Sequence, residues 1–161
     1  MSKPKKQQRV DYWDDPAAPR PTSRKPSASV IVRNFAGEVL LLLRPDSGRW
    51  TIPTGGLKKD ETLTRCAARE CREETGVDIE IISLVGVFSD PRHVSAYPDG
   101  EVRQPVNICF AARVIGGTLG TSDEAAEVAW VPPGRLDDYD IHPSIRRRIA
   151  HGLDGATPHV D

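Results

Sequence analysis

The chain has 161 residues, a length typical of a single domain that can bury a core without disulfides or structural metals. Its 22 basic and 23 acidic side chains give a formal net charge of −1. The charge is uneven, because residues 1–26 carry seven basic and three acidic groups, whereas residues 27–161 carry 15 and 20. An acidic body argues against a dedicated nucleic-acid-binding protein, which would usually present a basic face.

The three cysteines, Cys66, Cys71 and Cys109, match no common metal-ligand spacing. An odd number of thiols without such spacing is typical of a reducing compartment. The N-terminus is charged and lacks the apolar core of a secretory signal, and the longest apolar runs, such as residues 39–43, are far too short to cross a bilayer. The sequence therefore predicts a cytoplasmic protein with no membrane partner.

Residues 1–26 hold five of the 14 prolines and show no apolar periodicity. This composition predicts an extended N-terminal arm without secondary structure of its own. Tyr12 and Trp13 are unusual in such an arm, and two interpretations stay open: they pin the arm to the body, or they pin it to a second subunit. The second interpretation would make the protein a homodimer.

From residue 27 to residue 161 the pattern predicts one folded domain. Apolar and β-branched runs predict strands over residues 28–32, 39–43, 50–52, 79–88, 106–114 and 127–131. Helical patterns cover residues 63–75, closed by Gly76, and residues 143–152, whose basic face holds Arg146, Arg147 and Arg148. Residues 54–56 are predicted to be a loop and residues 89–105 a long connection. Strands, helix, strands and helix in this order favour an α+β fold.

The first predicted helix carries three carboxylates on one face. Glu70, Glu73 and Glu74 stand at positions i, i+3 and i+4, which are neighbours on a helical surface. Their mutual repulsion would be relieved by a hard divalent cation, since Mg²⁺ prefers carboxylate oxygen. Pairing of these glutamates with arginines on the same helix is the alternative interpretation, and the spacing alone does not decide between them.

The whole segment resembles the Nudix box. Residues 55–77 read GGLKKDETLTRCAARECREETGV. The fixed positions of the box fall on Gly55, Glu61, Arg69, Glu70, Cys71, Glu73, Glu74, Gly76 and Val77. Cys71 is the one departure, because the family usually has an aliphatic residue there; cysteine is a small hydrophobe and can pack in its place. Residues 50–56 are also similar to the family's entry into the box, with Thr54 where a third glycine is common.

The resemblance implies a Nudix-type α/β/α sandwich with a mixed sheet over residues 27–152. It implies Mg²⁺, or Mn²⁺ as a substitute, bound by Glu70, Glu73 and Glu74 with the Gly55 carbonyl. Such a metal would lower the pKa of a bound water, which then attacks a diphosphate. Glu61 and Arg69 would hold the loop and the helix together. The implied activity is hydrolysis of a phosphorus-containing anhydride in a nucleotide.

The catalytic base has several candidates. In some Nudix enzymes a helix glutamate serves, here Glu73 or Glu74, and in others the base comes from a distal loop. Glu124 and Glu127 precede the last predicted strand, and we favour Glu124 of the two. The alternative is that both are solvated loop residues.

Substrate contacts are expected from Arg44 and from the 89–105 connection, which offers Arg92, Tyr97 and Arg103. Arginines could clamp phosphates and Tyr97 could stack on a base, although exposed loop positions would look the same in sequence. His93 is a weaker candidate for the base.

Pro91 lies 14 residues beyond Val77 and resembles a feature of the ADP-ribose-cleaving branch. We therefore place ADP-ribose or a nucleotide sugar first among the small-molecule nucleotide substrates and nucleoside triphosphates next, with dinucleoside polyphosphates open. The competing hypothesis is a catalytically weak nucleotide sensor with the same fold. Such proteins often lose box carboxylates, and here the carboxylates are intact.

Overall fold

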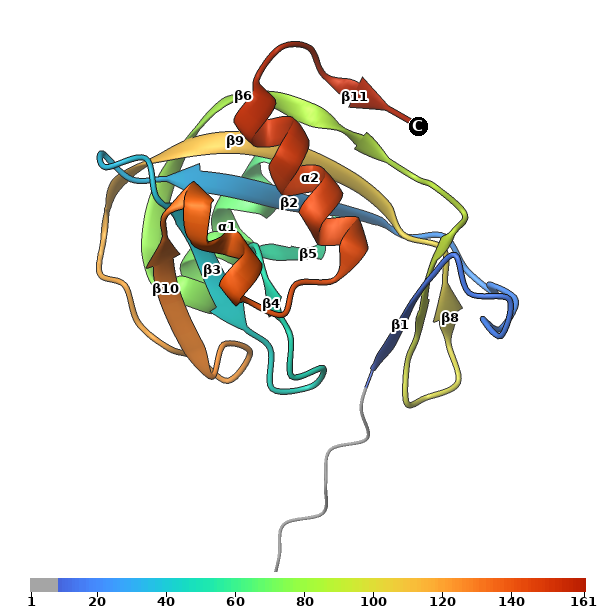
Figure 1. The fold of residues 1–161 in the computed structure, drawn as a ribbon. Helices are drawn as coiled ribbons and strands as arrows, with labels where there is room; N and C mark the ends of the chain where they lie inside the picture. Colours follow the sequence, from blue (N-terminus) through green and yellow to red (C-terminus); the bar gives the residue numbers. More distant parts are fainter. Residues whose placement is uncertain (1–8) are drawn as a thin grey trace, which may run out of the picture.

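The computed structural model describes residues 9–161, and a mixed β-sheet forms its centre (Figure 1). The sheet has the order β10-β3-β2-β9-β6-β11, with β4 paired to β3 and β5 to β2. Its strands are β2 (Pro26–Arg33), β3 (Val39–Leu43), β4 (Trp50–Thr51), β5 (Thr54–Gly56), β6 (Val77–Phe88), β9 (Val106–Gly117), β10 (Glu127–Val131) and β11 (His159–Val160). The pairs β2·β9 and β6·β11 are parallel and the others antiparallel, which confirms the α+β class and the mixed sheet.

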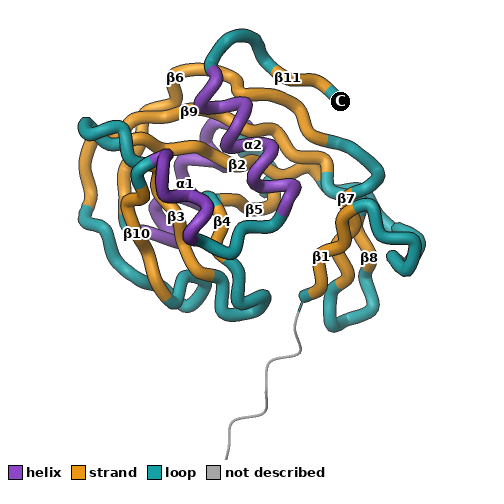
Figure 2. Tube along the Cα trace, in the orientation of Figure 1, coloured by secondary structure: helices purple, strands orange, loops and turns teal. Residues whose placement is uncertain are grey.

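Two α-helices cover the sheet, as Figure 2 shows in purple. Helix α1 spans Leu63–Thr75 and α2 spans Pro143–Asp154, while a short 3-10 helix, η1, covers Pro133–Asp138. The helices face two separate apolar cores. Cys66 and Cys71 of α1 belong to the first core, and Ile145 and Ile149 of α2 belong to the second.

The alternation of strand side chains explains why both cores form. On β2, Val30 and Val32 face the core under α1, whereas Ile31 faces the core under α2. On β3, Leu40 and Leu41 divide in the same way, and both are fully buried. A strand that is buried on both faces needs a continuous apolar run, so the sequence of β3 correctly predicts its place inside the sandwich.

A second, smaller sheet lies beside the first and has the order β1-β7-β8. Its strands are β1 (Val10–Trp13), β7 (His93–Ala96) and β8 (Val102–Arg103), and Figure 1 shows it to one side of the larger sheet. Two predictions are corrected here. The 89–105 connection contains two strands, and the N-terminal arm contains one, because β1 and β7 pair over four residues (Val10 opposite Ala96 to Trp13 opposite His93). Residues 1–8 of the predicted arm lie outside the described residues.

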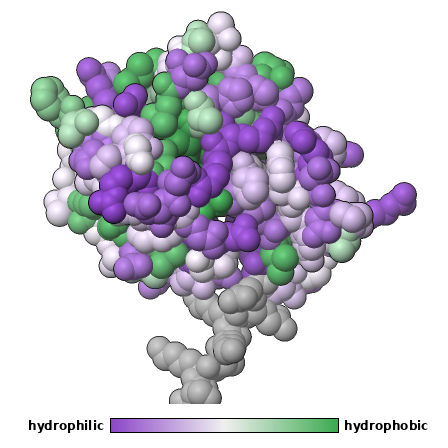
Figure 3. Space-filling model, in the orientation of Figure 1, coloured by the Kyte–Doolittle hydropathy of each residue, from purple (hydrophilic) through white to green (hydrophobic). Residues whose placement is uncertain are grey.

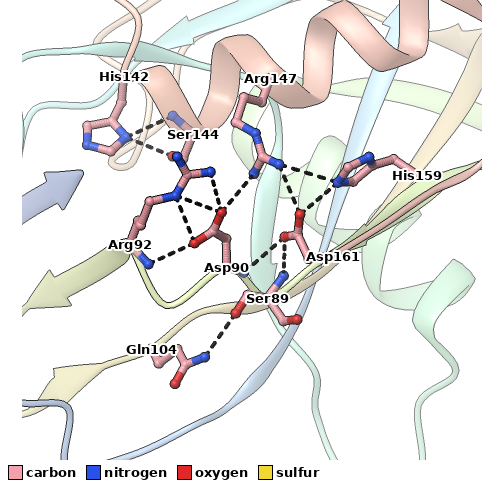
Figure 4. A network of polar contacts seen from close by, with 9 residues as sticks. All are labelled: Ser89, Asp90, Arg92, Gln104, His142, Ser144, Arg147, His159 and Asp161. Carbon is pink, nitrogen blue, oxygen red and sulfur yellow. Dashed lines mark hydrogen bonds and ion pairs between the residues drawn. The ribbon is translucent and has the colours of Figure 1, made fainter. Parts of the chain in front are cut away.

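Trp13 attaches the arm to the body of its own chain. Its ring lies under the guanidinium groups of Arg92 (4.8 Å) and Arg147 (5.3 Å), a cation–π arrangement. Arg147 also binds Asp161, whose carboxylate accepts hydrogen bonds from the amides of Ser89 and Asp90 (both 2.9 Å; Figure 4). Both distant ends of the described chain are therefore anchored to the segment that follows β6.

Candidate active site

A cleft of about 590 Å³ lies between the small sheet, α1 and α2, a volume typical of small-molecule sites. Basic side chains outnumber acidic ones along it. The basic residues are Arg9, Lys25, Arg44, Arg49, Lys58, Arg69, Arg103 and Arg148, and the acidic ones are Asp11, Glu70, Glu73 and Glu124. A concave surface with an excess of positive charge attracts anionic ligands.

Three carboxylates meet at one end of this region. Oxygen atoms of Glu70, Glu74 and Glu124 all lie within 4.8 Å of one another. The first two come from α1, where the i, i+4 spacing places them on one face, and the third comes from the loop before β10. Like charges this close repel each other, and a divalent cation would relieve that repulsion.

Glu74 is the buried member, with 1% of its surface exposed. Its Oε1 atom accepts a hydrogen bond from the amide of Thr54 (3.0 Å), whereas Oε2 is buried without a hydrogen-bond partner. The nearest cation is Arg44, whose Nη1 lies 3.9 Å from that atom. Burial raises the pKa of Glu74 to about 8, and the charges of Glu70 and Glu124 act in the same direction. A buried acceptor without a partner is costly, so Oε2 fits a metal-ligand role.

Glu70 packs directly against the backbone of Gly55. A Cβ atom built at Gly55 would stand 2.1 Å from the Glu70 Cδ atom, so any side chain there would displace the carboxylate. Burial raises the pKa of Glu70, although Arg69 opposes this through a 2.8 Å hydrogen bond to Oε1. The Gly55 carbonyl also faces α1, where it accepts a long hydrogen bond from the Cys66 thiol (3.6 Å).

Arg69 joins the loop to the helix. It forms a two-pronged ion pair with Glu61 (2.5 and 3.0 Å) and donates to the Gly56 carbonyl (3.2 Å). Glu61 also accepts the Lys58 amide, and these bonds, above all that from Arg69, lower the pKa of Glu61 to about 2. Arg69 also reaches Glu73 (3.2 Å), whose side chain is 54% exposed. Glu73 lines the cleft but stands outside the group of three carboxylates.

The loop before β10 is held in place by its own hydrogen bonds. The Ser122 hydroxyl donates to the Glu74 carbonyl (2.9 Å), and Ser122 and Ala125 form a tight turn. The amide of Ala126 donates to the Leu43 carbonyl (2.9 Å). Glu124 lies at the tip of this turn beside the helix carboxylates, whereas Glu127 begins β10 and is exposed outside the group.

A family description of the NUDIX domain matches residues 23–152. The chain belongs to the Nudix family. A MutT-like protein of Streptomyces ambofaciens is 35% identical over 138 residues, which cover 83% of this chain and 79% of that protein. An ADP-ribose pyrophosphatase of Methanocaldococcus jannaschii is 37% identical over 93 residues, 56% of this chain and 52% of that one. The crystal structure of a NUDIX hydrolase from Nitrosomonas europaea aligns with a TM-score of 0.66 at 26% identity, covering 84% and 76% of the two chains.

This Nudix chain is therefore a hydrolase that acts on nucleotide derivatives. Among its expected substrate residues, Arg44, Tyr97 and Arg103 line the cleft, and the Arg103 guanidinium lies 4.2 Å from the centre of the Tyr97 ring. Arg92 does not line it. Its guanidinium binds Asp90 (2.6 Å; Figure 4) and also covers the ring of Trp13. The expectation of a substrate contact from Arg92 therefore has no support from its position.

Several residues of the Nudix cleft are absent from the sequence-based expectations. Asp11 comes from β1 and Arg9 directly precedes that strand, whereas Arg148 comes from α2 and His142 is the N-cap residue of that helix. His93, considered as a base, bonds Asp11 (3.3 Å). No local signal marks β1, because a four-residue strand forms only when β7, about 80 residues later, is beside it. The sequence predicts the basic face of the C-terminal helix, but the spacing of its arginines does not distinguish Arg148 from Arg146 and Arg147.

Within residues 9–161, no helix is both long and apolar enough to cross a membrane.

Proposed function

We propose that this Nudix hydrolase cleaves the diphosphate linkage of a nucleoside diphosphate derivative with the help of Mg²⁺. The carboxylate group of Glu70, Glu74 and Glu124 carries the proposal, because one of its oxygens is buried without a partner beside a cationic cleft. When bound, Mg²⁺ would neutralise the diphosphate and lower the pKa of a coordinated water, and Mn²⁺ would serve in its place.

The position of each carboxylate in the site indicates its proposed role. Glu70 and Glu74 would hold the cation, with the Gly55 carbonyl beside them and Glu73 available from the same helix face. Glu124 is the best-placed base, since it belongs to the carboxylate group and its own side chain is exposed. Glu61 and Arg69 fix the loop on α1, so they act as positioning residues. Catalysis would then rest on orientation and charge stabilisation.

ADP-ribose or a nucleotide sugar is the first expected substrate class, and nucleoside triphosphates come next. The similarity to an ADP-ribose pyrophosphatase supports the first class, although that alignment covers about half of each chain. Arg44 and Arg103 on the cleft wall are placed to bind phosphates, and Tyr97 offers a ring for stacking.

The test is a cleavage assay with Mg²⁺ over ADP-ribose, nucleotide sugars, nucleoside triphosphates and dinucleoside polyphosphates. We expect cleavage of one class, and we expect Glu74→Gln to lower kcat/KM at least roughly a hundredfold, about 3 kcal/mol at the barrier. Glu127→Gln is the matched control, because Glu127 is exposed outside the carboxylate group. Normal turnover by Glu74→Gln would contradict the proposal, and tight binding of one compound without any cleavage would favour a nucleotide sensor.

We also propose a cytoplasmic location and a homodimer, with a small-molecule nucleotide and no membrane as partners. Ile82 and Leu84 on β6 and Ile115 on β9 are exposed apolar side chains, which suit a contact between subunits. The face of α2 drawn in Figure 3 is mostly hydrophilic and is a poor candidate for that contact. Sedimentation of the full chain would decide the oligomeric state.

A further inference from the structure

Arg148 on α2 differs from its two basic neighbours. Arg146 donates to the Tyr139 carbonyl (2.7 Å), and Arg147 binds Asp161 (2.9 Å). Arg148 is only 4% exposed, and its Nε atom is buried without a hydrogen-bond partner. Among residues 9–161, no carboxylate forms an ion pair with it.

Arg148 is among the residues that line the cleft, and its guanidinium carbon lies 5.8 Å from the centre of the Phe88 ring. Burial lowers the pKa of Arg148 to about 10, so the side chain stays charged at neutral pH. A buried charge without a partner is strongly destabilising. A perturbed charged group beside a cleft is therefore a candidate for ligand binding.

Asp11 on β1 supplies an acceptor to the same cleft. Its Oδ1 atom accepts from Arg9 (2.9 Å), from the Ser95 hydroxyl (2.5 Å) and from the His93 ring (3.3 Å). All of these hydrogen bonds end on Oδ1. Within the described chain, Asp11 Oδ2 accepts no hydrogen bond. Its charge also acts on Arg148 and raises that pKa. The Asp11 carboxylate would repel an anionic part of a ligand at this place. A neutral group could instead accept a hydrogen bond from Arg148 and donate one to Asp11.

The wall beside these two residues is neutral and partly aromatic. The rings of His93 and His142 lie 5.1 Å apart with a tilt of 33°. Burial lowers the pKa of both, to about 4 for His142, so both rings are uncharged at neutral pH. Ile145 lines the cleft next to them. A flat uncharged wall favours a planar heterocycle over a strongly hydrated phosphate.

We infer that Arg148 and Asp11 form a nucleobase-reading pair that selects keto bases over amino bases. Arg148 donates to the ring carbonyl and Asp11 accepts from the adjoining ring N–H, a pattern that guanine and hypoxanthine present. Adenine places an amino donor where Arg148 needs an acceptor. The inference rests on the proposed function in so far as the ligand is a nucleotide. It adds a specificity determinant from β1, which lies before the matched NUDIX domain.

The test is calorimetric binding of GMP, IMP and AMP to the full chain in EDTA, where no diphosphate is present to be cleaved. We expect GMP and IMP to bind at least about tenfold more tightly than AMP. Arg148→Met should reduce GMP and IMP to the affinity of AMP. Its melting temperature should stay equal or rise, because an apolar side chain of similar volume replaces a buried charge.

Arg146→Met is the matched control on the same helix and should keep the preference for GMP. Asp11→Asn is an independent second variant, because it removes the anionic acceptor without touching α2, and it should also lose the preference. Equal affinities of the wild type for GMP and AMP, no binding of any of the three at millimolar concentration, or an equal loss of all three in Arg148→Met would overturn the inference.

The two proposals fail in different ways. Cleavage of a diphosphate substrate with no base preference in binding would leave the proposed function standing and remove the base-reading pair. Selective binding of GMP and IMP without cleavage of any substrate would support the pair and remove the hydrolytic proposal for this site.

Discussion

Gly55 positions a carboxylate by having no side chain. The Glu70 Cδ atom occupies the space that a Cβ at Gly55 would need, at a separation of 2.1 Å. Gly56, the next residue, has nothing within 4 Å of the corresponding position. Of these two adjacent glycines, only Gly55 is required by a close contact, and that contact involves a proposed metal ligand.

We expect Gly55→Ala to lower kcat/KM roughly a hundredfold, because Glu70 must swing out of the carboxylate group. The melting temperature should fall by only a few degrees, since the displaced atoms belong to a flexible side chain. Gly56→Ala should retain near-wild-type activity. Steady-state kinetics and thermal melts of the two variants give the comparison, and equal activities would show that the Gly55–Glu70 contact does not matter.

His142 makes stability depend on pH. Burial, together with the charge of His93, lowers its pKa from 6.5 to about 4, and Arg49 and Arg9 act in the same direction while Asp11 opposes them. The unfolded chain therefore takes up a proton near pH 6.5, while the folded chain does so only near pH 4. The His142 contribution to stability is present at pH 7 and is lost as the pH falls through this window.

His142→Asn should flatten that dependence by roughly 1 kcal/mol between pH 7 and pH 5, after allowance for screening. Asparagine should still cap α2, as the His142 ring does by accepting the Ser144 amide (3.3 Å). Urea unfolding of both proteins at the two pH values measures the difference. Parallel pH curves would show that His142 titrates alike in the folded and unfolded states.

Strand β1 is an element that the sequence does not reveal, although it brings Asp11, and Arg9 directly before it, into the cleft. We expect deletion of residues 1–13 to raise KM severalfold with kcat nearly unchanged, because Asp11 is lost while α1 keeps its glutamates. The melting temperature should drop by a few degrees as Trp13 and the β1·β7 pairing disappear. A fall in kcat at constant KM would instead connect β1 to the chemical step. Unchanged sedimentation would exclude exchange of the arm between subunits.

The elements that could be predicted are those with local signals. Helix α1 has its exact predicted bounds, because Thr62 accepts the Arg65 amide (3.2 Å) as N-cap and Gly76 adopts a left-handed conformation (φ 76°) as C-cap. The continuous apolar sequence of β3 predicts that this strand is buried on both faces, as it is. The i, i+4 spacing places Glu70 and Glu74 together, and the resemblance to the box implies the Glu61–Arg69 contact, which the structure contains. Metal binding by this face stays a prediction.

The parts that escaped prediction depend on partners far away in the chain. Strands β1, β7 and β8 are short and half-polar, and they form because they pair with one another. Strand β5 was predicted to be a loop, and it is a strand because it pairs with β2. Arg92 and Arg148 look alike in sequence, yet one covers Trp13 and the other lines the cleft. Burial of an individual arginine is a tertiary property.

At the scale of the whole molecule, the carboxylate group opposes folding in the absence of metal. We expect Mg²⁺ at a hundredfold excess over its Kd to stabilise the protein by about 2.7 kcal/mol, or roughly 5–10 °C in Tm for a domain of this size. Glu74→Gln should abolish this shift and Glu127→Gln should keep it. Thermal melts in EDTA and in Mg²⁺ measure the effect, and a full shift in Glu74→Gln would place the cation elsewhere.

The anchoring of β1 to β7 also sets an order of events during synthesis. A ribosome releases the chain from its N-terminus, so β1 must wait for a partner about 80 residues behind it, on the order of ten seconds at ordinary elongation rates. Arg148 emerges later still, and the cleft is complete only when α2 has docked. A nascent chain therefore carries its box segment well before it can select a ligand, and a chain stalled between β9 and α2 would lack Arg148.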